Sequence, residues 1–173
     1  YTPYQPEISQ GTLQTIFEFQ TMMCELTGME VANSGMYDGA TSLAEAALMA
    51  CRITGRGRIA TLATVNPRWR QVVATYFQGQ PITQESLPPG AVTLTQEHAC
   101  LIVQYPDFFG SIEDLGPYAT AAHAAGALLI VAVNPTALGM LTPPGAFGAD
   151  IVVAEGQPLG QSPVFGGPYV GVF

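Results

Sequence analysis

The chain has 173 residues, enough for one domain with a single core, and 48% of them are hydrophobic. Its 13 acidic and 5 basic residues give a net charge of −8, which excludes a typical nucleic-acid-binding protein. Charged residues make up only 10% of the chain, against roughly 25% in an average soluble domain, so we expect a partner to cover part of the surface.

The opening residues 1–11 are expected to be extended, because their prolines disfavour helix in the residues before them. Apolar residues then recur at helical spacing over residues 13–26, and Gly28 is a natural C-cap, which predicts a helix. A second helix is predicted to begin at Ser42, because Ser42 and Glu45 match a capping box.

The rest of the chain alternates between predicted strands and helices. Another helix is predicted to start at Ser111 and to run through residues 118–126. Apolar strands separated by helices predict a mostly parallel sheet with helices on both faces. The predicted strands are residues 58–65, 99–106, 127–133, 149–156 and 169–173, with weaker ones at 71–79 and 91–96.

Two glycine-bearing segments resemble phosphate-binding turns. Residues 55–60 fit G-x-G-x-x-A but follow a helix and lead into a strand, the reverse of the order in a dinucleotide-binding fold, so we interpret this match as accidental. Residues 33–52 have the right order, because Gly35 and Gly39 permit a tight turn before a helix that directs free N–H groups outward. A well-capped helix explains the same pattern, and Asp38 would repel an anion there.

Few residues are candidates for catalysis. The two histidines, His98 and His123, are isolated, and we interpret both as structural. Neither a nucleophile elbow nor metal-ligand spacing occurs, so hydrolases and metalloenzymes have no support, and we expect no metal site. All the basic residues are arginines, interpreted as a solvated or salt-bridged face. The chain contains no lysine, whereas an internal aldimine with an aldehyde cofactor requires a lysine amine.

The cysteines, Cys24, Cys51 and Cys100, stand far apart in apolar stretches and form no CxxC pair. We expect buried, reduced thiols and therefore a reducing, cytoplasmic location. No apolar run reaches the roughly 20 residues of a membrane-spanning helix. Because the chain opens without methionine and stops within a strand-like run, we expect it to be a piece of a longer protein.

Four long blocks of the sequence resemble one known family. They are YTPYQPEISQGTLQ, NSGMYDGATSLAEAALMA, PPGAFGADIVVAEGQPLG and FGGPYVGVF, spread over essentially the whole chain. These blocks resemble the glycine dehydrogenase (decarboxylating) family, the P-protein of the glycine cleavage system. Within it, they are similar to subunit 1, the alpha subunit of the bacterial two-subunit form.

The resemblance implies an α/β, aspartate-aminotransferase-like fold, that of fold type I pyridoxal 5'-phosphate (PLP) enzymes. Residues 1–173 would be a single domain, a fragment of the large domain with a mostly parallel, seven-stranded-type sheet and helices on both faces, without the small C-terminal domain. The implied activity is PLP-dependent decarboxylation of glycine and transfer of the aminomethyl group to the lipoyl arm of the H-protein. Only the beta subunit, the implied partner, carries the Schiff-base lysine and binds PLP covalently.

By the same resemblance, Gln157 stands near the place of that lysine, and Asn134 stands where an acid usually faces the pyridine nitrogen. Gln157 cannot form an imine and Asn134 cannot supply the charge. We therefore expect the glycine turn at residues 33–39 to be inherited, on a subunit that is inactive alone and docks onto the catalytic one.

Several residues are expected to lie near the seam between the two subunits. A cluster of tyrosines is typical of a polar ligand site, an interface or ordinary surface packing. Glycines in the segment Phe165–Pro168 would let backbone N–H groups approach the phosphate of the partner's PLP. The candidates are Tyr1, Tyr4, Asn33 and Tyr37 at the seam, and Gly166 and Gly167 for the phosphate.

Three alternatives remain open. The chain is also compatible with a purely structural scaffold that contributes nothing to an active site. An autonomous PLP enzyme would need a lysine outside these residues. A Rossmann-type nucleotide-binding module would bind NAD saturably, and only the misplaced match at residues 55–60 points to it.

Overall fold

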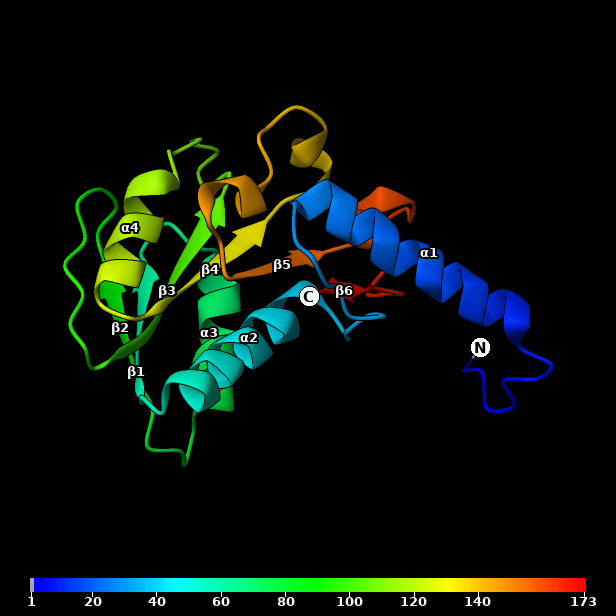
Figure 1. The fold of residues 1–173 in the computed structure, drawn as a ribbon, viewed down its shortest axis with the longest axis horizontal. Helices are drawn as coiled ribbons and strands as arrows, with labels where there is room; N and C mark the ends of the chain where they lie inside the picture. Colours follow the sequence, from blue (N-terminus) through cyan, green and yellow to red (C-terminus); the bar gives the residue numbers. More distant parts are fainter. Residues whose placement is uncertain (1) are drawn as a thin grey trace.

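The computed structural model describes residues 2–173, so the expectation for Tyr1 lies outside the described residues. The described residues form an α/β fold built on one mostly parallel sheet, which confirms the prediction from alternating apolar strands and helices (Figure 1). None of the described helices is long and apolar enough to cross a membrane.

The sheet has six strands in the order β2-β1-β3-β4-β5-β6. All neighbouring pairs are parallel except β5 and β6, which are antiparallel. The central strands β3, β4 and β5 consist almost entirely of buried residues, because they lie in the middle of the sheet between helical layers. The bounds are β1 Arg58–Leu62, β2 Thr83–Leu87, β3 His98–Tyr105, β4 Leu128–Val133, β5 Ile151–Glu155 and β6 Gly171–Val172.

Helices cover both faces of the sheet. Helices α2 and α3 pack against each other on one face, and α4 packs against β3 and β4 on the other (Figure 1). Helix α2 approaches the sheet closely because its buried side is built from Leu43 and several alanines. The bounds are α1 Gln10–Thr27, α2 Gly39–Thr54, α3 Pro67–Tyr76 and α4 Gly116–Ala124, with short 3-10 helices η1 Pro135–Gly139, η2 Pro144–Phe147 and η3 Gln157–Leu159.

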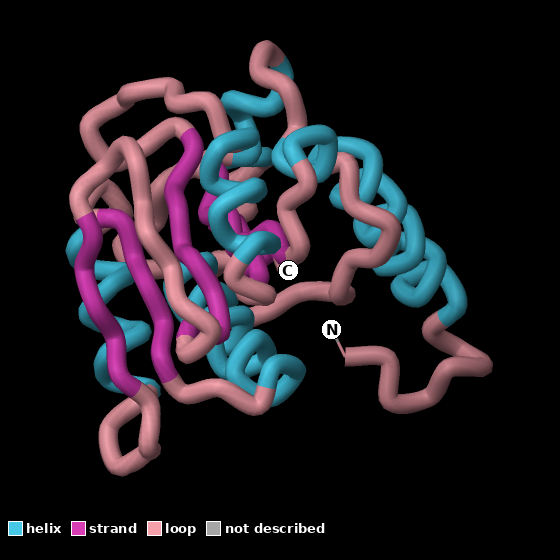
Figure 2. Tube along the Cα trace, turned by 60° about the vertical axis from the view of Figure 1, so that its left-hand side comes forward, coloured by secondary structure: helices cyan, strands magenta, loops and turns pink. Residues whose placement is uncertain are grey.

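Helix α1 extends away from the sheet (Figure 2). It ends where the sequence predicts, since Gly28 takes the left-handed conformation with φ of 74° and its N–H donates to the Cys24 carbonyl. Only Met23 and Thr27, near the end of the helix, are buried. The first turns of α1 therefore gain little stability from packing against this chain.

Four local predictions are wrong. Residues 71–79, predicted as a strand, mostly continue α3, because Asn66 caps that helix and Pro67 occupies its first turn. Residues 91–96 form no strand. Strand β2 was not predicted, because it is a polar edge strand without a buried apolar run. Helix α4 begins at Gly116 rather than Ser111, since the Asp114 carboxylate accepts from the Gly116 N–H at 2.9 Å.

The expected seven-stranded-type sheet is reduced to six strands among the described residues. The segment before α2 contributes only an isolated bridge, in which Met36 and Gly171 exchange both backbone hydrogen bonds. Gly35, with φ of 135°, bends the chain immediately before this bridge, so the pairing does not extend toward Asn33 as a ladder.

The cysteines follow the expectation of buried thiols in part. Cys51 and Cys100 are buried and Cys24 is half-buried, and all three are free. Burial raises the pKa of the Cys51 and Cys100 thiols, which keeps both protonated at neutral pH.

Candidate functional site

Polar side chains gather where the parallel strands end. Gln104 lies at the end of β3, Asn134 directly follows β4 and Glu155 is the last residue of β5. Together with Asn66 and Trp69 at the start of α3, they line a pocket of about 190 Å³. Ligands of open α/β sheets bind at this carboxyl edge, so the pocket marks the candidate site.

The N-terminus of α2 opens toward the same edge and is capped by the chain itself. The Asp38 carboxylate accepts from the Thr41 N–H at 2.7 Å, and the Thr41 hydroxyl accepts from the Asp38 N–H at 3.2 Å. The capping box is therefore formed by Asp38 and Thr41, and the prediction that Ser42 and Glu45 form it is wrong. Ser42 is instead buried within the first turn, where its hydroxyl donates to the Asp38 carbonyl at 2.8 Å.

Glu155 supplies a second carboxylate at this helix end. One oxygen, Oε2, accepts from the Gly39 N–H at 3.0 Å, at the first residue of α2. The other, Oε1, accepts from the Gln157 N–H at 2.9 Å and the Val170 N–H at 3.3 Å. A negative group thus already occupies the position in which free N–H groups and the helix dipole would attract a bound anion.

Two glycines make this arrangement possible. A Cβ on Gly39 would lie 2.8 Å from the Glu155 nitrogen and would also strike the Trp69 ring. A Cβ on Gly171 would lie 2.8 Å from the Asp38 carbonyl carbon. Strand β6 and the first turn of α2 therefore approach each other at a distance that only glycine permits.

The structure brings the two residues implied at the cofactor position to this edge. Asn134 lines the pocket, and its side-chain oxygen accepts from the Thr136 N–H at 3.1 Å and from the Thr136 hydroxyl at 2.7 Å. Gln157 begins η3 beside Glu155, and its side-chain amide donates to the Gln161 carbonyl. Both side chains therefore stabilise the turns that follow their strands.

Gly166 and Gly167 lie in the loop between η3 and β6. Their φ values of 113° and 155° lie in the region that favours glycine, and a Cβ at either position would meet no heavy atom within 4 Å. The loop returns to the edge at Val170, which Glu155 holds. The glycines therefore lie in open space, and conformation rather than crowding accounts for the residue type.

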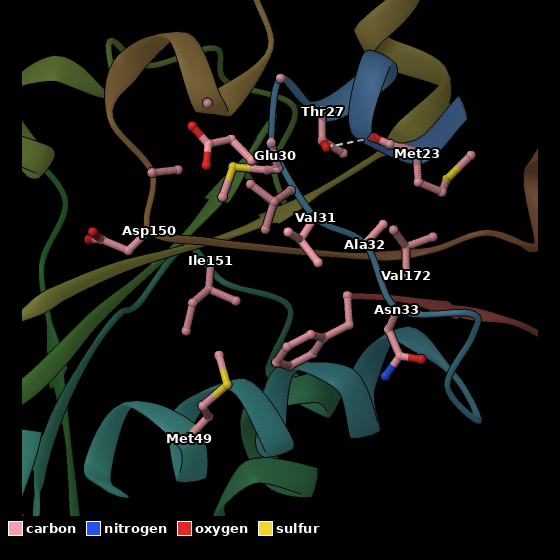
Figure 3. A pocket seen from close by; sticks show the side chains of 16 residues that line it. Met23, Thr27, Glu30, Val31, Ala32, Asn33, Met49, Asp150, Ile151 and Val172 are labelled. Atoms are coloured by element: carbon pink, nitrogen blue, oxygen red, sulfur yellow. Dashed lines mark hydrogen bonds between the residues drawn. The ribbon is translucent and has the colours of Figure 1, made fainter. Parts of the chain in front are cut away.

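The residues predicted at the seam do not meet in one place. Tyr37 is 81% exposed next to the capped helix end, whereas Tyr4 is 89% exposed in the coil ahead of α1. Asn33 lines an apolar groove of about 710 Å³ between the end of α1, β5 and α2 (Figure 3). Its N–H donates to the Phe173 carbonyl at 2.8 Å.

Exposed apolar side chains surround the same carboxyl edge. Phe109 is 75% exposed and Phe108 49% on the loop after β3, and Met140 follows η1. The loop is firmly held, since the buried Asp107 carboxylate accepts from the Phe109 N–H at 2.9 Å and the Ser111 N–H at 2.8 Å. Apolar groups presented in this way are typical of a contact surface.

The histidines lie outside this site. His98 is buried at the start of β3, where its Nε2 contacts the Glu85 carboxylate, and Glu85 also pairs with Arg58 at 2.7 Å. The hydrogen bond from His98, followed by the interactions with Arg58, lowers the pKa of Glu85. His123 Nε2 lies 2.9 Å from the Asp150 carboxylate. Both histidines therefore have structural partners, as the sequence predicts.

Glu155 is the residue that the sequence analysis missed. Its signal was present, because an acid that directly follows a buried parallel strand lies at the edge where ligands bind. What its carboxylate contacts depends on Gly39 and Val170, which are far from it in the sequence. The sequence therefore located Glu155 without indicating what it does.

The comparisons with known proteins agree with one another. The family model for the glycine cleavage system P-protein matches residues 1–173. The chain is 54% identical to a probable glycine dehydrogenase (decarboxylating) subunit 1 of Geobacillus kaustophilus, over 100% of this chain and 41% of the relative. The chain thus spans about two fifths of the length of the curated relatives that it matches.

Two solved structures are similar. A glycine decarboxylase (P-protein) of the glycine cleavage system, in inhibitor-bound form, has a TM-score of 0.95 and 48% identity, over 99% of this chain and 40% of the other. A putative O-acetylhomoserine (thiol)-lyase of Campylobacter jejuni has a TM-score of 0.61 and 13% identity, over 79% of this chain and 34% of the other. That protein carries a pyridoxyl-lysine monophosphate, and its likeness to this chain concerns the fold alone.

Proposed function

The chain belongs to the glycine cleavage system P-protein family, and from this premise we propose that it is part of the alpha subunit of a glycine dehydrogenase (decarboxylating). In this role it supports PLP-dependent decarboxylation of glycine by a beta subunit. It also supports transfer of the aminomethyl group to the lipoyl H-protein. We take residues 1–173 as one domain, a fragment of the large domain of a fold type I PLP enzyme.

One observation carries the division of labour: the residues at the carboxyl edge do not fit PLP. The 173 residues include no lysine, and Gln157 stands near the lysine's place. The N-terminus of α2, where a phosphate would bind, is occupied by the carboxylates of Asp38 and Glu155. A phosphate next to these two groups would be repelled, because like charges at short distance are unfavourable. We therefore assign covalent PLP to the companion subunit.

The surface around the edge supports a docking role. Phe108, Phe109 and Met140 expose apolar groups there, and Tyr37 stands beside the capped helix. In this proposal the companion covers these side chains, and the loop with Gly166 and Gly167 approaches the companion's PLP phosphate. Tyr1, Tyr4 and Asn33 would contact the companion elsewhere along the seam.

Reconstitution from the full-length subunits tests the proposal. We expect glycine decarboxylation only when this subunit and its companion are mixed. Borohydride reduction of the complex should place the pyridoxyl label on the companion alone. Turnover by this subunit in isolation, or a label on it, would overturn the assignment.

Contribution to the active site, as opposed to a scaffold role, is tested at Tyr37. We expect Tyr37→Ala to lower kcat/KM for glycine about tenfold and Tyr37→Phe to lower it less, since the phenyl ring would still fill the seam. Thr75→Ala, at an exposed position of α3, is the control. Unchanged kinetics in both Tyr37 variants, with the complex still assembled, would favour a scaffold.

A further inference from the structure

Three arginines of the chain differ in how their charge is balanced. Arg58 pairs with two carboxylates, Glu85 at 2.7 Å and Glu97 at 3.2 Å. Arg56 donates from Nη1 to three backbone carbonyls at 2.8–3.0 Å. Arg70 is half-buried, yet among the described residues it donates a single hydrogen bond, from Nη1 to the Ser86 hydroxyl at 3.3 Å.

The guanidinium of Arg70 is therefore under-satisfied. Its Nε atom is buried and has no hydrogen-bond partner, and no described carboxylate lies within salt-bridge distance of the side chain. A partly buried cation is unfavourable unless an anion or several acceptors compensate for its lost hydration. The structure thus leaves a planar, always-charged donor group without its counter-charge.

Arg70 lines a groove of about 300 Å³ between α3 and the edge strand β2. This volume is at the lower end for small-molecule sites, which suits a ligand of a few carbon atoms. The groove is unusually polar for the space between a helix and a sheet, which is normally filled by apolar side chains. Its walls are Thr61, Pro67, Arg70, Gln71, Ala74, Gln84 and Ser86.

The pleat of β2 explains why no acid of this chain neutralises Arg70. Successive side chains of a strand point to opposite faces, so Gln84 and Ser86 face the groove and Glu85 points away. Glu85 is already engaged by Arg58 and His98 on the other face. The lining of the groove consequently contains donors and amides but no carboxylate.

We propose that the groove between α3 and β2 binds a small carboxylate through the guanidinium of Arg70. The guanidinium fork matches a carboxylate in plane and charge. The Ser86 hydroxyl and the Gln71 amide lie beside it as additional donors. This site is separate from the carboxyl-edge pocket, and the proposal does not depend on where PLP binds.

Calorimetric titration of the full-length chain with succinate tests the site, with sodium chloride as the ionic-strength control. We expect saturable binding that Arg70→Gln weakens about tenfold or more, and that Arg70→Lys weakens less because the charge remains. Arg68→Gln is the matched control, since Arg68 is an exposed arginine two residues earlier in α3. Ser86→Ala is a milder second variant, which keeps the test valid if Arg70→Gln does not fold.

A second arm asks whether the carboxylate is supplied by a protein. If succinate does not bind but Arg70→Gln, unlike Arg68→Gln, weakens association with the companion subunit, an acidic side chain of that subunit occupies the groove. If succinate binds equally to all variants, or if neither succinate nor the companion distinguishes Arg70→Gln from Arg68→Gln, the proposal is wrong. Failure of the companion to associate with the unmodified chain would count against the proposed function and not against this site.

Discussion

The carboxyl edge of the sheet and the N-terminal arm, defined as residues 2–22, differ in how completely the chain satisfies its own groups. At the edge, backbone N–H groups of Gly39, Gln157 and Val170 all donate to one carboxylate, that of Glu155. In the arm, apolar side chains such as Phe17, which is 66% exposed, have no cover from the described residues.

This difference teaches where the chain is complete. The edge is closed because its donors and acceptors come from segments that the sheet already holds in place. The arm is a helix and coil with most of its apolar surface in solvent, and isolated helices gain most of their stability from packing. We infer that stability resides in the sheet and its edge, whereas the arm is available to a partner.

The strongest test of the comparison places the same substitution in both regions. Gly171→Ala should lower the free energy of unfolding by about 3 kcal/mol, because the new methyl group meets Ser42 and the Asp38 backbone. Gly11→Ala, in the first turn of α1, meets nothing within 4 Å and should raise it by up to about 0.5 kcal/mol. Urea unfolding of both variants measures this, and equal effects would contradict the comparison.

A smaller effect is expected from removing one charge. Glu155→Gln should lower the free energy of unfolding by about 1–3 kcal/mol, because three N–H groups lose a charged acceptor and the amide introduces a donor among them. Glu18→Gln on α1 is the control, since its exposed carboxylate accepts only from Gln14 and the change should stay within about 0.5 kcal/mol. Equal unfolding midpoints for the two variants would show that Glu155 is not a structural anion.

The smallest effect on stability is expected in the arm. Phe17→Ser should change the free energy of unfolding by no more than about 0.5 kcal/mol, because the ring is largely exposed. If the arm contacts the companion, the same variant should weaken association at least tenfold in a sedimentation or calorimetric measurement. Gln14→Ser, at an exposed polar position of the same helix, should leave association unchanged. Large destabilisation by Phe17→Ser would mean that the arm is part of the folded body.

Much of the fold was predictable, because its signals are local. Long apolar runs predicted β3, β4 and β5, and Gly28 predicted the end of α1. Strand β2 was not predictable, since TQESL is polar and is a strand only because its backbone pairs with β1. Residues 71–79 were misassigned because β-branched residues resemble a strand, whereas the cap at Asn66 makes most of them helical.

The sequence by itself determined what chemistry is missing: a chain without lysine offers no amine for an aldimine, and no folding of its 173 residues changes that. It also located the polar ends of the strands. Only the tertiary structure decided that Glu155 fills the end of α2 and that Arg70 lacks a counter-charge. Both depend on contacts between distant segments, and a hydrogen bond across 116 positions of sequence leaves no periodic or compositional trace in either segment.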